Sequence, residues 1–159
     1  MTDLARARFL ALILPAALLA GAWGSQLFGG LYPCEMCHWQ RWPHYAALLL
    51  AVLALLLRAT AASRPLVLLA ALAILVSGAI GVFHAGVEYR WWQGLTRCSS
   101  PISGGGSTAD VLSQIMNAPT VRCDEVQWSL FGISLAGWNA LISIPGALAI
   151  GMLCLRRPR

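Results

Sequence analysis

The chain has 159 residues, a length that fits one domain, and 58% of its residues are hydrophobic while only 11% are charged. Soluble domains carry about 25% charged residues, so this composition excludes an ordinary water-soluble protein. The positive charges are all arginines, and because they lie at the ends of apolar runs and form no stripe with interleaved aromatic residues, they indicate membrane topology and no nucleic-acid partner.

The first apolar run covers residues 9–28, and crossing a bilayer takes about 20 residues. Arg6 and Arg8 precede it, as in a signal peptide, but the run is too long for one and residues 32–34 form no cleavage site. We therefore expect a retained membrane anchor. The second run, residues 41–57, is shorter, so its helix should begin among the aromatic residues before it.

The third and fourth apolar runs complete the predicted bundle. The third, residues 65–87, opens at a proline, which is favoured at the first position of a helix. The fourth covers residues 131–155. We predict an all-α membrane protein with four transmembrane helices in one domain over residues 1–159, and a long outer loop at about residues 88–130.

Arginine is unevenly distributed across these spans. One side carries Arg6, Arg8, Arg58, Arg64, Arg156, Arg157 and Arg159, and the other carries Arg41, Arg90, Arg97 and Arg122. By the positive-inside rule, the first side is cytoplasmic, so both termini should lie there. The tryptophans of the outer boundary, expected to form an interfacial belt, are Trp39, Trp42, Trp91, Trp92 and Trp128.

The long outer loop contains a stretch rich in Ser, Gly and Pro at residues 99–107, which predicts a flexible connection. Residues 108–110 then favour the start of a short helix. Its expected apolar face consists of Val111, Leu112, Ile115 and Met116. This pattern is typical of a helix that lies on a membrane surface.

Four of the five cysteines map to the outer side, namely Cys34, Cys37, Cys98 and Cys123. This side can hold disulfides if it faces an oxidising compartment. Cys154 maps to the inner end of the fourth span, where we expect it to be a small buried hydrophobic residue.

Cys34 and Cys37 have the C-x-x-C spacing of a redox dithiol, in which a thiolate near a helix N-terminus or a cation has a lowered pKa. Arg41 follows one helical turn after Cys37 and is predicted to stabilise its thiolate or an anionic ligand; the alternative is contact with lipid phosphate. With His38 the pair also matches the C-x-x-C-H pattern of c-type haem attachment. A membrane cytochrome is the less favoured hypothesis, because no soluble helical domain is available to surround a haem.

Cys98 and Cys123 enclose 24 residues that include the flexible stretch. A structural disulfide and an exchangeable one fit this spacing equally well, since a bond on a flexible loop is open to attack by another thiol. A zinc site made from four cysteines fits less well, because this pair is not a compact knuckle. We therefore expect no metal.

Larger motifs around these cysteines resemble the DsbB family of disulfide-forming membrane proteins. The resemblance covers nearly the whole chain. Its motifs are Cys34-Glu35-Met36-Cys37-His38-Trp39-Gln40-Arg41, residues 83–88 with Trp91-Trp92, the Cys98 and Cys123 pair, and residues 128–134 leading to Trp138-Asn139.

This resemblance implies a four-helix bundle in the bacterial inner membrane, with its cysteines in the periplasm. It implies a DsbA-like periplasmic thioredoxin-fold partner that delivers electrons to a Cys98–Cys123 disulfide through a mixed disulfide at Cys98. The electrons would pass to Cys34–Cys37 and then to ubiquinone or menaquinone in the membrane. Such a partner has a potential near −120 mV, so a quinone supplies the downhill acceptor that a dithiol alone does not.

The resemblance also implies a quinone site. It places Cys37 against the quinone ring, Arg41 where it polarises the ring, and His84 near it; from the residues alone, His84 is equally well an interfacial histidine. A vitamin K epoxide reductase-like enzyme, which also couples thiols to quinones, is the alternative, but it has its C-x-x-C near the last helix. A structural protein with two disulfides is the remaining hypothesis.

Overall fold

The structure, a computed structural model, describes residues 2–95, 107–109, 112, 116 and 121–156. Within these residues the chain forms four long helices and one hairpin of two short strands. The elements are α1 (Asp3–Leu27), α2 (Glu35–Leu56), α3 (Ser63–Glu88), β1 (Ser129–Leu130), β2 (Ile133–Ser134) and α5 (Leu135–Leu155).

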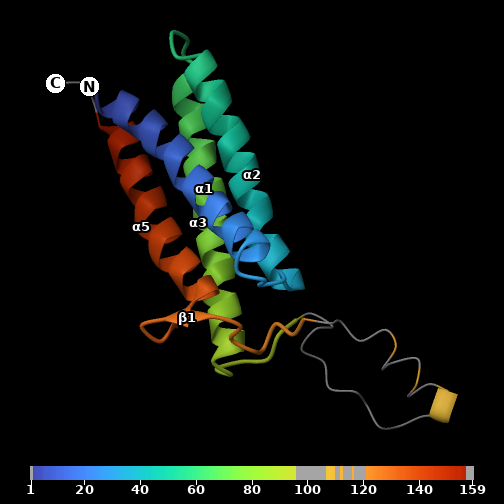
Figure 1. Cartoon of the computed structure of the whole chain (residues 1–159). Helices are drawn as coiled ribbons and strands as arrows, with labels where there is room; N and C mark the ends of the chain where they lie inside the picture. Colours follow the sequence, from blue (N-terminus) through green and yellow to red (C-terminus); the bar gives the residue numbers. More distant parts are fainter. Residues whose placement is uncertain (1, 96–106, 110–111, 113–115, 117–120, 157–159) are drawn as a thin grey trace.

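The four helices pack side by side as a bundle (Figure 1). Helix α3 packs along both α2 and α5, and α1 packs against α2 and α5. Both termini and the link between α2 and α3 lie at one end of the bundle, whereas the α1–α2 connection and the β1–β2 hairpin lie at the other. The cysteine pair at the start of α2 is therefore remote from the termini.

Small residues allow the helices to approach closely, as is usual in membrane bundles. Buried alanines form much of the core along α1, α2 and α3. A Cβ on Gly78 would lie 2.7 Å from Cγ1 of Ile144, and one on Gly81 would lie 2.9 Å from the carbonyl oxygen of Ala136. The contact between α3 and α5 therefore depends on glycine.

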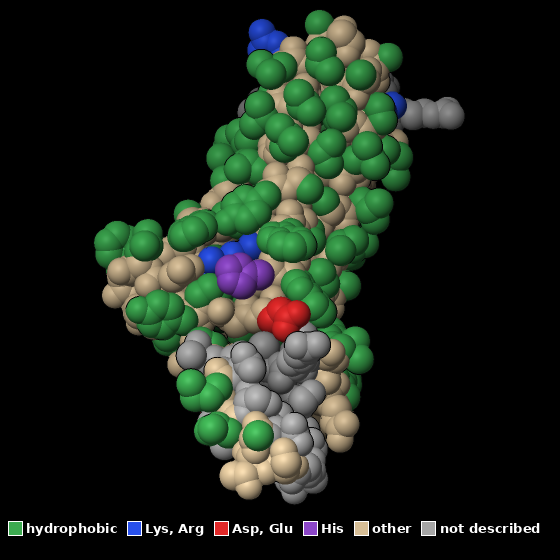
Figure 2. Space-filling model, turned by 90° about the vertical axis from the view of Figure 1, so that its right-hand side faces the viewer, with side chains coloured by type: hydrophobic (Ala, Val, Ile, Leu, Met, Phe, Trp, Pro, Cys, Tyr) green, Lys and Arg blue, Asp and Glu red, His purple; other side chains and the backbone are tan. Residues whose placement is uncertain are grey.

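The outside of the bundle is apolar. Exposed leucines on three helices include Leu49, Leu56, Leu69, Leu72, Leu141 and Leu148, and hydrophobic side chains cover most of the helical surface in view (Figure 2). Such a surface suits lipid and not water.

Among the described residues, three helices are long and apolar enough to cross a membrane: α1, α3 and α5. Helix α2 has 22 residues, which is enough to span a bilayer by length. Its first half, however, contains the buried polar residues Gln40, Arg41 and His44. These side chains are buried against other helices of the bundle.

The helix starts differ from the predicted spans. Helix α3 begins at Ser63, so Pro65 is its third residue and not its first. Helix α1 begins at Asp3 and not at residue 9, because Thr2 caps it by accepting a hydrogen bond from the backbone N–H of Ala5. Helix α5 begins at Leu135 and not at residue 131, because Ser134 caps it and the preceding residues form the hairpin. The prediction of an all-α chain is therefore wrong at this hairpin, whose two short strands pair antiparallel.

The hairpin turn consists of Phe131 and Gly132, both with positive φ, at 53° and 76°. This is the pattern of a type I′ turn, which matches the twist of the two strands. The usual sequence of such a turn is Asn-Gly. Here phenylalanine takes the place of asparagine, so the turn could not be recognised within an apolar run. The predicted surface helix at residues 108–116 lies mostly outside the described residues.

Candidate active site at the start of helix α2

The C-x-x-C pair lies at the N-terminus of α2. Cys34 is the N-cap residue, and its sulfur accepts a hydrogen bond from the backbone N–H of Cys37 at 3.3 Å. The two sulfur atoms are 2.8 Å apart. The helix thus starts six residues before the predicted apolar span at residue 41, and its first turn holds both thiols in one place.

Cys123, from the distant outer loop, lies beside this pair. Its side chain is fully buried. The sulfur atoms of Cys34 and Cys123 and the Nε2 atom of His84 all lie within 4.8 Å of one another. The structure thus brings a member of the second predicted pair to the first, whereas its predicted partner, Cys98, lies outside the described residues.

The two thiols of the C-x-x-C pair differ in acidity. The hydrogen bond with Cys34 lowers the pKa of the Cys37 thiol, and this outweighs the opposing effect of burial. Hydrogen bonds with Cys123 and Cys37, together with burial, raise the pKa of the Cys34 thiol. Of the two thiols, Cys37 is therefore the more acidic, which makes it the better leaving group.

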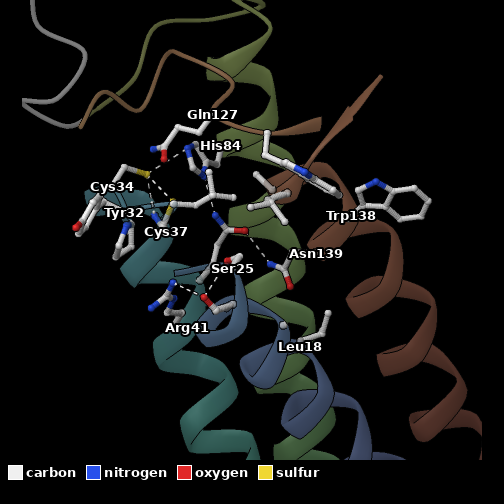
Figure 3. A pocket seen from close by; sticks show the side chains of 18 of the residues that line it. Leu18, Ser25, Tyr32, Cys34, Cys37, Arg41, His84, Gln127, Trp138 and Asn139 are labelled. Carbon is white, nitrogen blue, oxygen red and sulfur yellow. Dashed lines mark hydrogen bonds between the residues drawn. The ribbon is translucent and has the colours of Figure 1, made fainter. Parts of the chain in front are cut away.

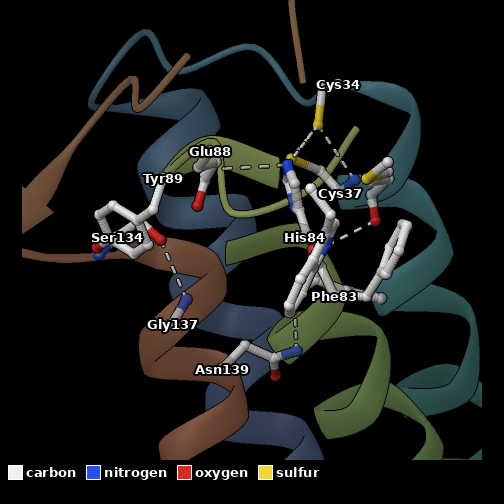
Figure 4. A network of polar contacts seen from close by, with 12 residues as sticks. Cys34, Cys37, Phe83, His84, Glu88, Tyr89, Ser134, Gly137 and Asn139 are labelled. Atoms are coloured by element: carbon white, nitrogen blue, oxygen red, sulfur yellow. Dashed lines mark hydrogen bonds and ion pairs between the residues drawn. The ribbon is translucent and has the colours of Figure 1, made fainter. Parts of the chain in front are cut away.

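His84 lies inside the site. Only 2% of its surface is exposed, and its Nε2 atom is 3.5 Å from the sulfur of Cys34 and 3.9 Å from Oε1 of Glu88 (Figure 4). Its Nδ1 atom is 2.8 Å from Nε2 of Gln40. The structure therefore places His84 inside the bundle, in contact with Cys34.

A cavity of about 240 Å³ adjoins the cysteines and lies among all four helices (Figure 3). Helix α1 contributes small residues, among them Ala17, Gly21 and Ala22, which leave the space open. Helix α5 contributes Trp138 and Asn139. A mostly apolar cavity with a few polar groups is the usual form of a small-molecule site.

Arg41 lines this cavity, and its position is set by α1. Its guanidinium donates hydrogen bonds to Oε1 of Gln26 at 2.9 Å and to the carbonyl oxygen of Ala22 at 3.1 Å, and it lies 5.4 Å from the ring centre of Trp23. With 8% of its surface exposed, it is a largely buried cation. A guanidinium has further N–H donors beyond these bonds, and they suit a ligand oxygen.

Two buried polar atoms near the cavity have no hydrogen-bond partner among the described residues, Nδ1 of His44 and Oε2 of Glu88. Both residues line the cavity. Unpaired buried polar atoms are costly, so a polar ligand in the cavity would offset that cost. His38, which completes the haem-attachment pattern, is exposed and lies outside the cavity lining.

Sequence reasoning missed a buried polar network behind the cysteines. Its members are Gln40, His44, Ser77, Asn139 and Ser143, joined by side-chain hydrogen bonds. The sequence did contain a signal for this network, because its polar residues interrupt apolar runs. Gln40 and His44 lie one helical turn apart on α2, and Asn139 and Ser143 do so on α5. Polar residues inside membrane helices are usually functional.

Comparisons with known proteins identify the family of the chain. A family model described as "Disulfide bond formation protein DsbB" matches residues 5–153. The chain is also similar to disulfide bond formation protein B of Aromatoleum aromaticum, with 31% identity over 170 residues that cover 96% of this chain and 94% of the relative. No solved structure matches the chain.

Proposed function

The chain belongs to the DsbB family of disulfide bond formation proteins, and from this premise we propose that it is a quinone-dependent protein-disulfide oxidoreductase. It oxidises a DsbA-like periplasmic thioredoxin-fold protein and passes the electrons to ubiquinone or menaquinone. The observation that carries the proposal is the position of Cys34, which contacts Cys37 on one side and lies within 4.8 Å of Cys123 on the other. One sulfur thus links the two predicted pairs.

The first proposed exchange takes place at the outer loop. A thiolate of the reduced partner attacks Cys98 in a Cys98–Cys123 disulfide, a mixed disulfide forms at Cys98, and Cys123 leaves as a thiolate. The partner's second thiolate attacks the mixed disulfide, so the partner leaves oxidised. Its two electrons now reside on Cys98 and Cys123 as thiolates.

The second exchange uses the cluster seen in the structure. The Cys123 thiolate attacks Cys34 in a Cys34–Cys37 disulfide, and Cys37 leaves as the thiolate that its lowered pKa favours. Cys98 then attacks Cys123 in the resulting Cys34–Cys123 bond, which restores the outer disulfide and releases Cys34. The two electrons have moved to the C-x-x-C pair.

The cavity beside Cys37 fits a quinone. Its lining is mostly apolar, and Arg41 and His84 supply polar groups on its walls. A bound quinone supplies the acceptor for two electrons and two protons and is released as quinol, which restores the Cys34–Cys37 disulfide. Cys37 would face the quinone ring, and Arg41 would donate a hydrogen bond to one of its oxygens.

The proposed placement is the bacterial inner membrane, with four spans in one domain and α2 as the fourth membrane helix. Both termini lie on the same end of the bundle, as do Arg8, Arg58 and Arg64, which are joined by hydrogen bonds to the backbone across elements. This end is assigned to the cytoplasm by the positive-inside rule. The cysteines then face the periplasm.

The direct test uses the purified full chain with a reduced DsbA-like protein and a water-soluble quinone. We expect the partner to be oxidised with one quinone reduced per disulfide formed. The Cys37→Ser variant should be inactive, and the Cys154→Ser variant, altered at the far end of α5, serves as the matched control. Absence of turnover with both ubiquinone and menaquinone analogues, despite intact outer cysteines, contradicts the proposal.

A further inference from the structure

The side chain of Gln40 joins the cysteine site to α5. Its Nε2 atom lies 2.8 Å from Nδ1 of His84, and its Oε1 atom accepts a hydrogen bond from Nδ2 of Asn139 at 2.8 Å. Gln40 and His84 are both more than 90% buried. Both residues also line the cavity, and buried polar atoms of this kind are normally hydrogen-bonded.

Backbone carbonyls fix which way the two amides face. Nε2 of Gln40 also donates to the carbonyl oxygen of Met36 at 3.3 Å, and Nδ2 of Asn139 also donates to the carbonyl oxygen of Ser77 at 3.2 Å. A carbonyl oxygen can only accept, so a reversed amide would face oxygen with oxygen at both places. The orientation of the Gln40 and Asn139 amides is thus determined by backbone carbonyl oxygens, which cannot donate a hydrogen bond.

This orientation determines where His84 carries its proton. Because the Gln40 amide donates to Nδ1, that nitrogen must present its lone pair, and the proton of the neutral ring lies on Nε2. Nε2 in turn is 3.5 Å from the sulfur of Cys34. The same sulfur accepts the backbone N–H of Cys37 at 3.3 Å, so two N–H groups face Cys34. The His84 ring is also hydrogen-bonded to the backbone of Cys123, and its Nε2 atom lies 3.9 Å from Oε1 of Glu88.

Taken together, the donors all point in one direction. Asn139 donates to Gln40 and Gln40 donates to His84, which directs the His84 Nε2–H at the sulfur of Cys34, and that sulfur lies 2.8 Å from the sulfur of Cys37. We call these five residues the one-way hydrogen-bond chain. Hydrogen bonds aligned in this way polarise one another, so each strengthens the next.

We infer that Gln40 and Asn139 are positioning residues that hold His84 in the Nε2–H tautomer, so that His84 donates a hydrogen bond to the Cys34 sulfur and does not act as its base. This inference rests on the proposed function, in which Cys34 is released during the second exchange. A donor already aimed at this sulfur stabilises the charge that develops on it, as preorganised donors do in other active sites.

The same tautomer disfavours a metal at this place. The sulfurs of Cys34 and Cys123 and the Nε2 atom of His84 are close enough together to resemble a zinc site. A histidine binds a metal through a ring nitrogen that has no proton. With the proton held on Nε2, His84 has no lone pair to offer from this side.

The test measures the tautomer directly by ¹⁵N NMR of histidine-labelled full-length protein in detergent micelles, with the outer cysteines reduced. The His84→Asn variant identifies the His84 signals by their loss. We expect a protonated Nε2 and an unprotonated Nδ1 in the wild-type protein at neutral pH. A proton on Nδ1, or on both nitrogens, overturns the inference.

Two variants test whether the Gln40 side chain determines the tautomer of His84. Gln40→Met has similar length but no donor, so we expect both tautomers to appear. Turnover should fall about tenfold, because His84 then no longer reliably donates to the charge that develops on Cys34. Ser143→Ala is the control: it removes a bond to Oδ1 of Asn139, but the Ser77 carbonyl still orients that amide, and the tautomer should not change. A Gln40→Met variant that keeps Nε2–H as its single tautomer counts against the assignment.

These readouts separate the two proposals. The tautomer is measured without partner or quinone, so it stands even if the wild-type protein fails to reduce any quinone. Conversely, full quinone-linked turnover in a protein whose His84 carries its proton on Nδ1 preserves the proposed function and removes the positioning role.

Discussion

The sulfur of Cys34 lies 3.5 Å from Nε2 of His84, although the two residues are 50 positions apart in the chain. Helix α2 presents the cysteine from its N-cap, and α3 presents the histidine one turn before its end. This contact places the Cys34 thiol between the His84 ring and the Cys37 thiol.

Cys37 should react with alkylating reagents at a lower pH than an ordinary thiol. Its pKa is lowered by the hydrogen bond with Cys34, so the thiolate fraction, and with it the rate, rises as the pH passes through a value below the usual one. Iodoacetamide labelling of the reduced protein, followed by mass spectrometry across a pH series, measures this. Cys34→Ala removes the hydrogen bond and should shift the profile to higher pH; an unshifted profile contradicts the assignment.

Cys123→Ala should accumulate a mixed disulfide between Cys98 and the DsbA-like partner. In this variant Cys98 is a free thiol, so with the oxidised partner it attacks the partner's disulfide and one partner sulfur leaves as a thiol; without Cys123 the chain has no neighbouring thiol to displace the partner from Cys98. The complex is measured on a non-reducing gel and should disappear when Cys98 is also replaced. Persistence of the complex in that double variant shows that another cysteine is the entry point.

Arg41→Lys should raise the quinone KM by about tenfold or more, because a lysine cannot reproduce two directed hydrogen bonds and the stacking on Trp23. Steady-state rates over a range of quinone concentrations give the value. Arg58→Lys, at the opposite end of the bundle, is the matched control and should behave as wild type. Equal KM values for the two variants exclude Arg41 from the quinone site.

Gly81→Ala should destabilise the bundle by about 1–3 kcal/mol, because the new Cβ would lie 2.9 Å from the carbonyl oxygen of Ala136 and would push α3 away from α5. Thermal unfolding in detergent measures the loss as a lower midpoint. Gly151→Ala meets nothing within 4 Å and should be neutral or slightly stabilising. Equal midpoints for the two variants refute the close α3–α5 contact.

Phe131→Asn should stabilise the protein by about 1 kcal/mol. Phe131 is 87% exposed and has a φ of 53°, a conformation that asparagine adopts more readily than phenylalanine. The control is Phe28→Asn, because Phe28 is also exposed but has a φ of −108°. Stabilisation by both changes attributes the effect to the lost aromatic surface and not to the backbone.

Much of the fold could be predicted because a helix that crosses a bilayer requires a long run of apolar residues. Runs of apolar residues with arginines at their ends predict membrane helices, and three of the described helices meet that requirement. Helix ends were less predictable. The residues that decide them, Thr2, Cys34 and Ser134, act through single hydrogen bonds to the next turn, and such bonds leave little trace in hydropathy.

The sequence alone determined the C-x-x-C pair, since its spacing is local chemistry and its position before an apolar run places it at a helix start. It also determined the apolar character that requires a membrane. Only the tertiary structure decided that Cys123 and His84 meet Cys34, and that Gln40 and Asn139 orient that histidine. These contacts join residues on different helices, and their distances follow from how closely glycine and alanine allow the helices to pack.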